Sequence, residues 1–466
     1  MKIKFGTDGW RAVIGREYTE DNVARLTTGV AYWLKEYFPN PRVVVGFDCR
    51  FGGARFAEIV ANVLDFHGVQ VIYDTHPVTT PVISYAAKKY EASLGIILTA
   101  SHNPPDYNGY KLKGGYGGPL LPAQIAEVEA HVPEEIEVNY WSLDQKISRK
   151  EDLTALYLEE VRRQFDLDAI RNAPFQVAYD AMYGSGQFVV RELLPDALLF
   201  RCEWNPHFYG INPEPVEKNL GEFQDYLKGQ NADIALVNDG DADRIGLLDG
   251  DGNYIDSHML LLLLIHYLHR YKGKSGKVVC GFSSSVKIAQ YCKQHGLDLE
   301  VVPIGFKHIC DRMLHEDVLV GGEESGGIAV QGHIPERDGI WNGLLLFQWM
   351  TETGKSIGEL MDEVREIVGP FAYRRIDLKI PEELKQEIVE RCKQDAYQAF
   401  GDFKVQNRED LDGWKYFLNE DEWVMIRPSG TEPVLRTYAE GKTPERAIAI
   451  LEACHSTLLG PDYKNK

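Results

Sequence analysis

The sequence predicts an α/β protein in which three similar α/β domains with mixed sheets are followed by a smaller C-terminal α+β domain. Short apolar runs rich in Val, Ile and Leu alternate with helical patterns up to about residue 370, and this alternation is typical of sheets that are covered by helices. This alternation of strand and helix patterns occurs in three successive units of about 110 residues each. After Gly369-Pro370 the strand-like segments become polar at alternate positions, which indicates a sheet with one solvated face.

The first unit is expected to alternate helices and strands. Thr19 is suited to cap a helix, and Glu20 and Asp21 suit the positive end of its dipole. Two further helices are expected at 53–67, ended by Gly68, and from Thr80-Pro81 onward. The strands expected in this unit are 42–48, 69–74 and 94–100.

The second and third units repeat this order of elements. In the second unit, a helix from about residue 186 lies between two apolar strands, and a hairpin that turns at Asp249-Gly250-Asp251-Gly252 follows. In the third unit, a helix from about residue 257 precedes three strands. The expected ranges are 175–180, 233–238 and 245–255 in the second unit, and 277–282, 299–303 and 318–321 in the third.

The last unit is expected to be a small α+β domain. It contains a charged helix over 381–398 and a final helix from about residue 444. Its expected strands are 373–380, 414–418, 423–426 and 434–440. We therefore predict four domains: 1–145, 146–256, 257–368 and 369–466.

The composition is that of a globular protein. The chain has 466 residues, of which 44% are hydrophobic and 26% charged, so it can bury a large core without disulfides. The net charge of −20 disfavours nucleic acid and anionic membranes as partners. The seven cysteines include no Cys-x-x-Cys pair, which argues against a disulfide framework and a thiolate zinc site. No apolar run approaches the length of a membrane span, and we expect a cytoplasmic protein.

The segment Thr99-Ala100-Ser101-His102-Asn103-Pro104 directly follows an expected buried strand. Ligands of α/β sheets bind beyond the carboxyl ends of the strands, so Ser101 is well placed to be a nucleophile. A Ser/Asn-Pro turn that merely ends the strand is the alternative. A hydrolase nucleophile elbow is disfavoured, because the segment lacks the Gly-x-Ser-x-Gly pattern.

Three carboxylates alternate in the loop Asp239-Gly240-Asp241-Ala242-Asp243-Arg244, which also follows an expected strand. Holding them together without a cation is unfavourable because the charges repel one another. Oxygen ligands without His or Cys favour Mg²⁺. An EF-hand is excluded, because its sixth position would be Arg244 and its twelfth Gly250. A plain acidic surface turn remains the alternative.

Two glycine-rich segments have the chemistry of sugar and phosphate recognition. Gly321-Gly322-Glu323-Glu324-Ser325-Gly326-Gly327 offers carboxylates and a hydroxyl to the paired hydroxyls of a sugar. Arg427-Pro428-Ser429-Gly430-Thr431-Glu432-Pro433 offers backbone N–H groups, two hydroxyls and a forked cation, which suit a phosphate. Taken singly, each segment is better explained as a plain loop or turn.

Five motifs in fixed order make the sequence similar to one family. They are Phe5-Gly6-Thr7-Asp8-Gly9-Trp10-Arg11, TASHNP at 99–104, DGDADR at 239–244, GEESGG at 322–327 and RPSGTEP at 427–433. Together they closely resemble the α-D-phosphohexomutase superfamily, which includes phosphoglucomutases, phosphomannomutases and phosphoglucosamine mutases. The resemblance runs from residue 5 to about residue 440. It implies four domains around a central cleft and an isomerase that moves a phosphoryl group within a hexose phosphate.

The resemblance also implies a role for individual residues. Ser101 is the implied phosphoserine, and it joins three aspartates as a ligand of Mg²⁺. Lys111 inherits the role of general acid/base, with Arg11 and His102 in support. The implied metal ligands are Ser101, Asp239, Asp241 and Asp243, and the implied substrate contacts are Lys307, Glu323, Ser325, Arg427, Ser429, Gly430 and Thr431.

The implied reaction interconverts hexose 1-phosphate and hexose 6-phosphate through a hexose 1,6-bisphosphate, which also serves as activator. The two glutamates of the sugar loop favour glucose as substrate, with mannose tolerated. Gly327 stands where related enzymes usually have His, and His308 or His333 is the expected substitute. The alternatives are a phosphoglucosamine mutase, a Mg²⁺-dependent sugar-phosphate phosphatase and a non-catalytic sugar-phosphate-binding protein. The only partner expected is the phosphorylated hexose, and the chain is expected to be a monomer or a homodimer.

Overall fold

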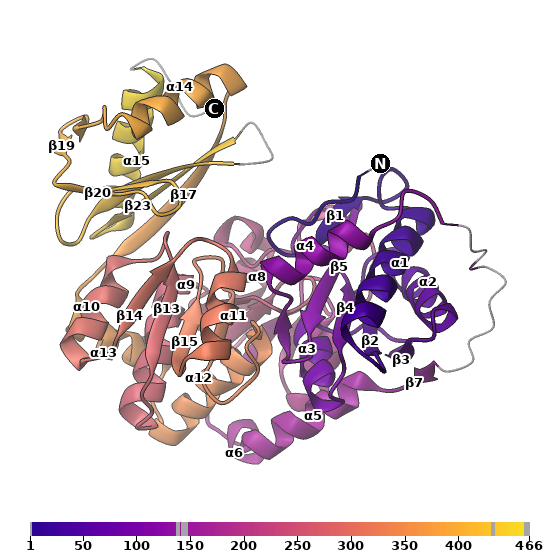
Figure 1. Ribbon diagram of the computed structural model, residues 1–466. Helices are drawn as coiled ribbons and strands as arrows, with labels where there is room; N and C mark the ends of the chain where they lie inside the picture. Colours follow the sequence, from indigo (N-terminus) through magenta and orange to yellow (C-terminus); the bar gives the residue numbers. More distant parts are fainter. Residues whose placement is uncertain (1, 137–139, 141–147, 430–433, 461–466) are drawn as a thin grey trace. The chain divides into compact units, whose positions relative to one another are not determined.

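The computed structural model describes residues 2–136, 140, 148–429 and 434–460 (Figure 1). The chain forms two compact units. The first contains residues Met1–Lys274 and Gly305–Leu360, and the second contains Ser275–Ile304 and Met361–Lys466. All three expected α/β regions and the C-terminal α+β region have the predicted class of structure.

The first region is built on a mixed sheet with the strand order β1-β5-β4-β2-β3-β7, in which β6 pairs with β5. Strands β4, β2 and β3 run parallel to one another, whereas β5 is antiparallel to both β4 and β1. The strands are β1 (Trp10–Val13), β2 (Arg42–Phe47), β3 (Gln70–Tyr73), β4 (Leu94–Leu98), β5 (Tyr107–Gly114), β6 (Gly118–Pro119) and β7 (Arg149–Lys150). The helices are α1 (Glu20–Tyr37), α2 (Gly53–Phe66), α3 (Thr80–Lys89) and α4 (Pro122–His131).

The predicted helix boundaries of this region are confirmed by their caps. The Thr19 hydroxyl accepts a hydrogen bond from the backbone N–H of Asn22 at the start of α1, as predicted. Gly68 follows α2 with a positive φ of 77°, a conformation that glycine adopts without strain. The sequence analysis did not predict β5, because its lysines and glycines interrupt the apolar alternation, although most of the strand is buried.

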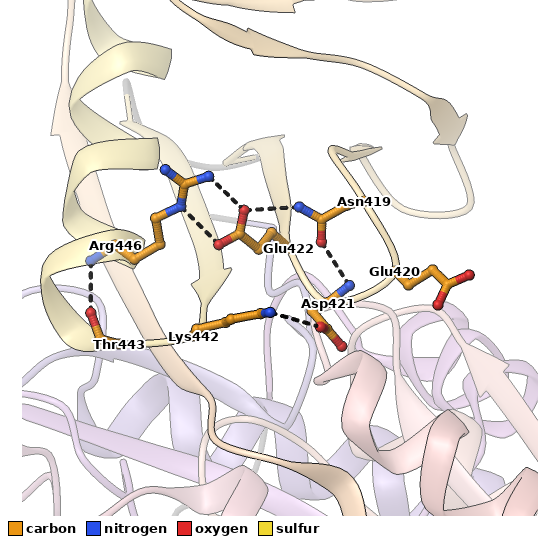
Figure 2. A pocket seen from close by; sticks show the side chains of 7 residues that line it. All are labelled: Asn419, Glu420, Asp421, Glu422, Lys442, Thr443 and Arg446. Carbon is orange, nitrogen blue, oxygen red and sulfur yellow. Dashed lines mark hydrogen bonds and ion pairs between the residues drawn. The ribbon is translucent and has the colours of Figure 1, made fainter.

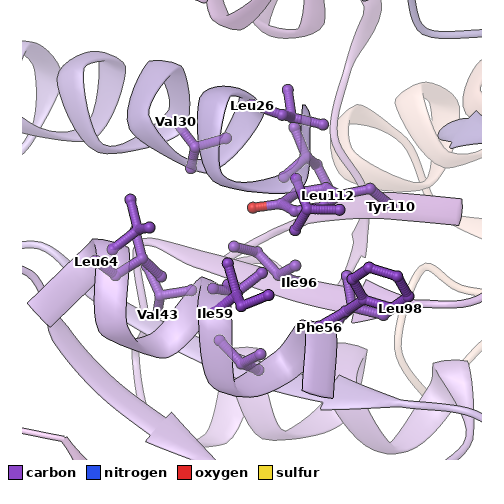
Figure 3. Close-up of a cluster of buried hydrophobic side chains, with 14 of the residues drawn as sticks. Leu26, Val30, Val43, Phe56, Ile59, Leu64, Ile96, Leu98, Tyr110 and Leu112 are labelled. Atoms are coloured by element: carbon purple, nitrogen blue, oxygen red, sulfur yellow. The ribbon is translucent and has the colours of Figure 1, made fainter. Parts of the chain in front are cut away.

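Alternate residues of the central strands enter two different layers. Val43, Leu98 and Tyr110 pack with Leu26 of α1 and Phe56 of α2 in one continuous core (Figure 3). The opposite face of the sheet is covered by α3: a Cβ on Gly46 would lie 2.6 Å from Ile83 Cδ1. This two-sided cover explains why the strands are apolar at successive positions rather than at alternate ones.

The second region is a five-stranded sheet with the order β12-β11-β10-β8-β9. Strand β10 runs parallel to β8 and antiparallel to β11, which forms the predicted hairpin with β12. The strands are β8 (Val177–Asp180), β9 (Leu198–Phe200), β10 (Ile234–Asn238), β11 (Ile245–Asp249) and β12 (Tyr254–Ile255). The helices are α5 (Leu153–Gln164), α6 (Leu167–Arg171), α7 (Gly186–Leu193) and α8 (Gly221–Leu227).

The third region supplies elements to both compact units. In the first unit, β15 and β16 form an antiparallel hairpin. In the second unit, β13 and β14 pair in parallel. The elements are α9 (Ser257–His266), β13 (Lys277–Gly281), α10 (Val286–His295), β14 (Leu299–Val302), α11 (Phe306–His315), β15 (Val318–Gly322), β16 (Ile328–Val330), α12 (Gly339–Thr353) and α13 (Ile357–Val368).

The C-terminal region is an antiparallel sheet with the order β17-β23-β22-β21-β20. Helices α14 and α15 accompany this sheet, and α15 packs against β23 and β17. The elements are β17 (Ala372–Lys379), α14 (Glu382–Lys393), β18 (Ala399–Phe400), β19 (Phe403–Lys404), β20 (Asn407–Glu409), β21 (Trp414–Phe417), β22 (Trp423–Pro428), β23 (Val434–Gly441) and α15 (Pro444–Leu459). The prediction of one helix over 381–398 is wrong at its end, because α14 stops at Lys393 and Asp395 adopts a positive φ of 54°.

A buried lysine ties the C-terminal sheet to the Ser275–Ile304 segment of the same unit. Lys415 Nζ donates to the carbonyl oxygens of Phe282 and Ser284 and lies 3.9 Å from the ring centroid of Trp423. Burial lowers the pKa of Lys415 to about 8, as expected for an ammonium group removed from water. Across the described residues, no helix combines the length and the apolar character that crossing a bilayer requires.

Candidate active site

The predicted nucleophile lies in a strained turn at the carboxyl end of β4. Ser101 is buried and adopts a positive φ of 51°, which is unusual for a residue with a side chain. Its backbone N–H donates to Thr99 Oγ1 at 2.9 Å, and the Thr99 hydroxyl donates to Asp48 Oδ2 at 2.5 Å. The surrounding hydrogen bonds therefore hold Ser101 in a conformation that the local sequence alone does not favour.

The Arg50 side chain forms hydrogen bonds with the backbone of the same turn. Its guanidinium donates to four backbone carbonyl oxygens of the 101–107 segment at 2.6–2.9 Å. Arg50 Nε lies 3.2 Å from Asp48 Oδ2, and both side chains are fully buried. The planar fork of an arginine can satisfy several acceptors at once, so one side chain fixes the course of the whole loop. The acceptors are the carbonyl oxygens of Ser101, Asn103, Pro104 and Tyr107.

The three aspartates of the 239–244 loop converge, as predicted. Asp239, Asp241 and Asp243 each offer a carboxylate oxygen within 4.8 Å of the others, and all three are buried. Asp241 Oδ1 and Asp243 Oδ1 are buried without a hydrogen-bond partner. Burial and the neighbouring carboxylates raise the pKa of Asp239 well above its ordinary value. Orphaned oxygens and mutual repulsion are what a cation relieves, so the triad fits a hard divalent metal.

Ser101 lies directly beside this triad. Its Oγ donates to Asp239 Oδ2 at 2.6 Å. The backbone N–H of Thr80 donates to the Asp241 carbonyl oxygen at 2.9 Å, and the Thr80 hydroxyl donates to Asp241 Oδ2 at 2.6 Å. The carboxyl ends of β4 and β10 and the start of α3 thus bring the serine and the acidic loop together.

Lys111 extends from β5 into the acidic cluster. Its Nζ lies 2.7 Å from Asp241 Oδ2, 3.0 Å from Asp243 Oδ2 and 3.0 Å from Asp8 Oδ2. Burial alone would lower the pKa of Lys111, but the three carboxylates outweigh it and raise the pKa above its ordinary value. Lys111 is therefore a protonated ammonium at neutral pH.

His102 and Arg11 flank the serine. His102 Nδ1 lies 3.3 Å from Ser101 Oγ. Burial, and then the positive charges of Arg244 and Arg11, hold the pKa of His102 well below its ordinary value, so the imidazole is neutral. Arg11 Nη1 donates to Asn103 Oδ1 at 2.6 Å. The site thus contains a neutral imidazole beside the Ser101 hydroxyl and a protonated lysine within the acidic cluster that this hydroxyl contacts.

The predicted sugar loop connects β15 to β16. Glu323 Oε1 accepts the backbone N–H of Gly305 at 2.7 Å. Burial and the neighbouring Glu324 raise the pKa of Glu323 to about 7. Ser325 is half-buried in the loop, and Lys307 is the second residue of α11, whose N-cap is Gly305.

Arg337 packs against Gly327 of the sugar loop. A Cβ on Gly327 would lie 2.5 Å from Arg337 Cδ, and no side chain fits that gap without movement. His333, one of the two expected substitutes for the missing His, lies 2.9 Å from Asp338 Oδ2 and stacks on Trp341 with 3.7 Å between ring centroids. These contacts do not test the substitution, and it stays a prediction for His333. No contact described for His308 places it against Gly327, and its proposed substitution stays untested.

The predicted phosphate loop lies in the second compact unit. Arg427 Nε lies 3.0 Å from Asp412 Oδ1, and the other oxygen of Asp412 accepts the backbone N–H of Ile304 at 2.9 Å. Ser429 is buried, and its carbonyl oxygen accepts from Lys385 Nζ at 3.3 Å. The predicted contacts Gly430 and Thr431 lie outside the described residues.

A shallow pocket of the same unit contains none of the predicted site residues (Figure 2). Arg446 forms two hydrogen bonds with the Glu422 carboxylate at 2.8 and 2.9 Å, and Asn419 Nδ2 donates to Glu422 Oε2. Lys442 Nζ lies 3.7 Å from Asp421 Oδ2. These charges neutralise one another, so the pocket has the character of a surface ion-pair cluster.

Four residues of the site did not emerge from the sequence analysis as functional: Asp8, Arg50, Thr80 and Arg337. Arg50 follows a strand, so the strand-end rule that pointed to Ser101 would have found it. Arg337 lies 329 positions from its partner Asp8 in the sequence, and no local sequence pattern predicts that contact.

Four family models match the chain in order. They are the α/β/α domains I, II and III and the C-terminal domain of phosphoglucomutase/phosphomannomutase, and they match residues 2–139, 155–252, 256–367 and 385–454. A "Phosphoglucomutase/phosphomannomutase" of Thermococcus kodakarensis is 30% identical over 454 residues, which are 96% of each chain. A "Probable phosphoglucosamine mutase" of Pyrococcus furiosus is 31% identical over 453 residues, again 96% of each chain.

Solved structures give the same result. A protein of Thermus thermophilus, provisionally described as a phosphomannomutase, is 33% identical, with a TM-score of 0.88 over 98% of this chain and 99% of that one. An N-acetylphosphoglucosamine mutase of Aspergillus fumigatus, 16% identical with a TM-score of 0.56, shares the fold; it was solved with GlcNAc-6P and magnesium. The chain belongs to the phosphoglucomutase/phosphomannomutase family of the α-D-phosphohexomutase superfamily, whose members are phosphohexomutases, a class of isomerases.

Proposed function

We propose that this phosphohexomutase interconverts hexose 1-phosphate and hexose 6-phosphate through a phosphorylated Ser101 and a hexose 1,6-bisphosphate. The observation that carries the proposal is the hydrogen bond of 2.6 Å between Ser101 Oγ and Asp239, inside a triad of buried carboxylates. A phosphoryl group on Ser101 would add nearly two negative charges there, and only a cation can balance them.

In the proposed reaction, phospho-Ser101 first donates its phosphoryl group. The bond between phosphorus and Ser101 Oγ breaks, and a bond from phosphorus to the free sugar hydroxyl forms. The sugar hydroxyl gives its proton to neutral His102, and the serine oxygen leaves and takes a proton from Lys111. After the bisphosphate turns around, Ser101 Oγ returns its proton to Lys111 and attacks the other phosphate. The bond between that phosphorus and its sugar oxygen breaks, the sugar oxygen takes the proton from His102, and Ser101 regains a phosphoryl group. Positioning and charge neutralisation are the main demands of such a transfer.

The electrostatics of the site support distinct roles for the flanking groups. Lys111 is protonated, so it suits the acid that donates to the departing oxygen, while neutral His102 can accept a proton near Ser101 Oγ. Arg11 supplies a fixed positive charge beside the loop. Asp239, Asp241 and Asp243 would hold Mg²⁺, together with Ser101; when bound, the ion neutralises charge on the phosphoryl oxygens. Arg427 and Ser429, with Gly430 and Thr431, are proposed to hold the phosphate that does not react.

The test is a comparison of wild-type protein with Ser101→Ala. Wild-type protein incubated with glucose 1,6-bisphosphate should gain one phosphate on the tryptic peptide that contains residue 101, and it should convert hexose 1-phosphate to hexose 6-phosphate. Ser101→Ala should lose both properties and retain the wild-type circular dichroism spectrum. Full activity of Ser101→Ala would show that another group carries the phosphoryl.

Glucose is the proposed main substrate, with mannose tolerated, because the sugar loop carries two adjacent glutamates. The second candidate is an amino sugar. Relatives of Pyrococcus abyssi and Methanococcus maripaludis, both 31% identical, are named as phosphoglucosamine mutases, the former with the qualifier "Probable". Repulsion from Glu324 contributes to the raised pKa of Glu323, and an ammonium group on the sugar would relieve that repulsion.

One assay separates the two candidates. The 1-phosphates of glucose, mannose, glucosamine and N-acetylglucosamine are supplied at equal concentration with Mg²⁺, and kcat/KM is measured for each. The highest value for glucose supports the first candidate, and the highest value for glucosamine supports the second. Release of inorganic phosphate without isomerisation would instead support a sugar-phosphate phosphatase.

A further inference from the structure

We propose that Arg337 is a positioning residue that joins the sugar loop to the metal-binding loop, and that Gly327 is small in order to admit it. The inference deepens the proposed function and rests on it, since it names a residue that aligns the same site. It concerns the 322–327 loop on one side and the 239–244 loop on the other.

Arg337 forms ion pairs with two carboxylates that are far apart in the sequence. Its Nη2 lies 2.6 Å from Asp8 Oδ2 and 2.7 Å from Asp243 Oδ2. The side chain is 6% exposed, and its Cζ lies 5.2 Å from the ring centroid of Phe306. A buried guanidinium with these partners is fixed in position, because one of its nitrogens must stay within reach of two carboxylates at once.

Lys111 contacts the same two carboxylates. Its Nζ lies 3.0 Å from Asp8 Oδ2 and 3.0 Å from Asp243 Oδ2. The four side chains thus form a closed, buried ring of ion pairs in which a cation and a carboxylate alternate. If Arg337 is removed, Asp243 loses one of its two cationic partners, and Lys111 is then free to shift toward Asp243 and away from Asp8, so the position of the proposed acid changes.

The stem of Arg337 passes directly over Gly327. A Cβ on Gly327 would lie 2.5 Å from Cδ and 3.2 Å from Cγ of Arg337. The φ of Gly327 is not in the positive range, so its φ does not require glycine, and the close approach of Arg337 does. Because the ion pairs hold the far end of the side chain, the stem cannot move aside freely.

The sugar loop is also fastened to the end of the metal-binding loop. The backbone N–H of Ile245 donates to the Gly326 carbonyl oxygen at 3.0 Å, and a Cβ on Gly326 would lie 2.3 Å from Ile245 O. A displacement of Glu323 or Ser325 by a bound sugar is therefore transmitted through Gly327 and Arg337 to Asp243. This arrangement links recognition of the sugar to the geometry of the metal ligands.

The test measures Mn²⁺ binding to the free protein by electron paramagnetic resonance, and kcat with glucose 1-phosphate separately. Arg337→Ala removes a positive charge that competes for Asp243, so Mn²⁺ should bind about fivefold more tightly. At the same time, kcat should fall about tenfold because Lys111 loses its alignment. A general loss of structure would weaken both properties, so opposite changes identify a positioning role.

Further variants test the pairing with Gly327. Gly327→Ala should displace Arg337 and reproduce both changes, and Gly327→Ala combined with Arg337→Ala should match Arg337→Ala alone to within about twofold. Arg337→Lys keeps the charge and should bring Mn²⁺ affinity back to within about twofold of wild type. Matched controls are Arg163→Ala, an exposed arginine of α5, and Gly221→Ala, where a Cβ meets no atom within 4 Å.

The outcomes separate this inference from the proposed function. Mutase activity in the wild-type protein, together with unchanged or weaker Mn²⁺ binding in Arg337→Ala, would overturn the inference alone. Additive effects of the two substitutions would also overturn it, as would failure of wild-type protein to bind Mn²⁺. If the Mn²⁺ affinities change as expected but the wild-type protein has no mutase activity, the proposed function is overturned and the positioning role of Arg337 is supported.

Discussion

Arg50 Nη2 donates to the carbonyl oxygen of Ser101 at 2.6 Å. The same nitrogen donates to Asn103 O at 2.7 Å, and Nη1 donates to two further carbonyl oxygens of the loop. Ser101 is the proposed nucleophile and has a positive φ. A single buried guanidinium therefore stabilises the backbone conformation from which the serine hydroxyl is presented.

We expect Arg50→Lys to slow phosphoryl transfer with little effect on substrate binding. Lysine keeps the positive charge but cannot serve four carbonyl acceptors in a plane, so the Ser101 turn relaxes. The value of kcat should fall about 10- to 100-fold, while KM should stay within about threefold. Steady-state kinetics with glucose 1-phosphate measure both. Arg55→Lys, on the partly exposed side of α2, is the matched control, and a wild-type kcat in Arg50→Lys would contradict the role.

Asp239→Asn should abolish stabilisation by Mg²⁺ without harming the metal-free protein. Burial and two neighbouring carboxylates already disfavour the ionised form of Asp239 and raise its pKa, so a neutral amide costs little there. A ligand that binds only the folded state raises the melting temperature as its concentration rises. Thermal melts in EDTA and in about 5 mM Mg²⁺ compare the variant with Asp225→Asn as control. An equal shift by Mg²⁺ in both variants would place the metal elsewhere.

Glu323 should make the stability of the protein depend on pH. Its pKa is raised to about 7 from an ordinary value of 4.5, so the folded state keeps a proton that the unfolded state loses at lower pH. Stability of the wild type should therefore fall as pH rises from about 5 through 7, by roughly 2 kcal/mol relative to Glu323→Gln. Urea unfolding at pH 5.5 and pH 8 measures this difference. Glu192→Gln is the control, and parallel pH profiles for wild type and Glu323→Gln would refute the assignment.

Asp412→Ala should weaken substrate binding more than it slows the reaction. Asp412 holds Arg427 Nε at 3.0 Å and the N–H of Ile304 at 2.9 Å, so its loss removes one contact that orients the guanidinium proposed to bind the non-reacting phosphate. Remote phosphate contacts supply binding energy, and KM for glucose 1-phosphate should rise about tenfold, with kcat within about threefold. Asp410→Ala, an exposed partner of Arg408, should leave KM unchanged. A purely kcat effect of Asp412→Ala would argue against this role.

Local sequence patterns were sufficient for most of the fold. Thr19 caps α1, and the alternating helices and strands occur in the predicted order. Strand β5 escaped prediction because Lys111 and Lys113 look like solvent-exposed residues, although both are buried against carboxylates. The end of α14 was also mispredicted, since charged residues beyond Lys393 are compatible with a helix. The four domain boundaries stay predictions.

The chemistry of the site was only partly predictable. Ser101 and the three aspartates follow strands, and strand ends meet at one edge of an α/β sheet, so their types and order were informative. The convergence of the aspartates is confirmed by the structure. Arg337 could not be found in this way, because its partners Asp8 and Asp243 lie on other segments and share no pattern with it.

The sequence by itself determined the order of the elements, the motifs and the kinds of charged group that the protein carries. The tertiary structure decided which of these groups meet, and therefore which lysine stays protonated, which histidine stays neutral and why Gly327 has no side chain. The reason is physical: helix and strand preferences act between near neighbours in the chain, whereas the energy of a charge depends on its burial and on the distance to other charges. Those two quantities exist only once segments hundreds of residues apart have packed together.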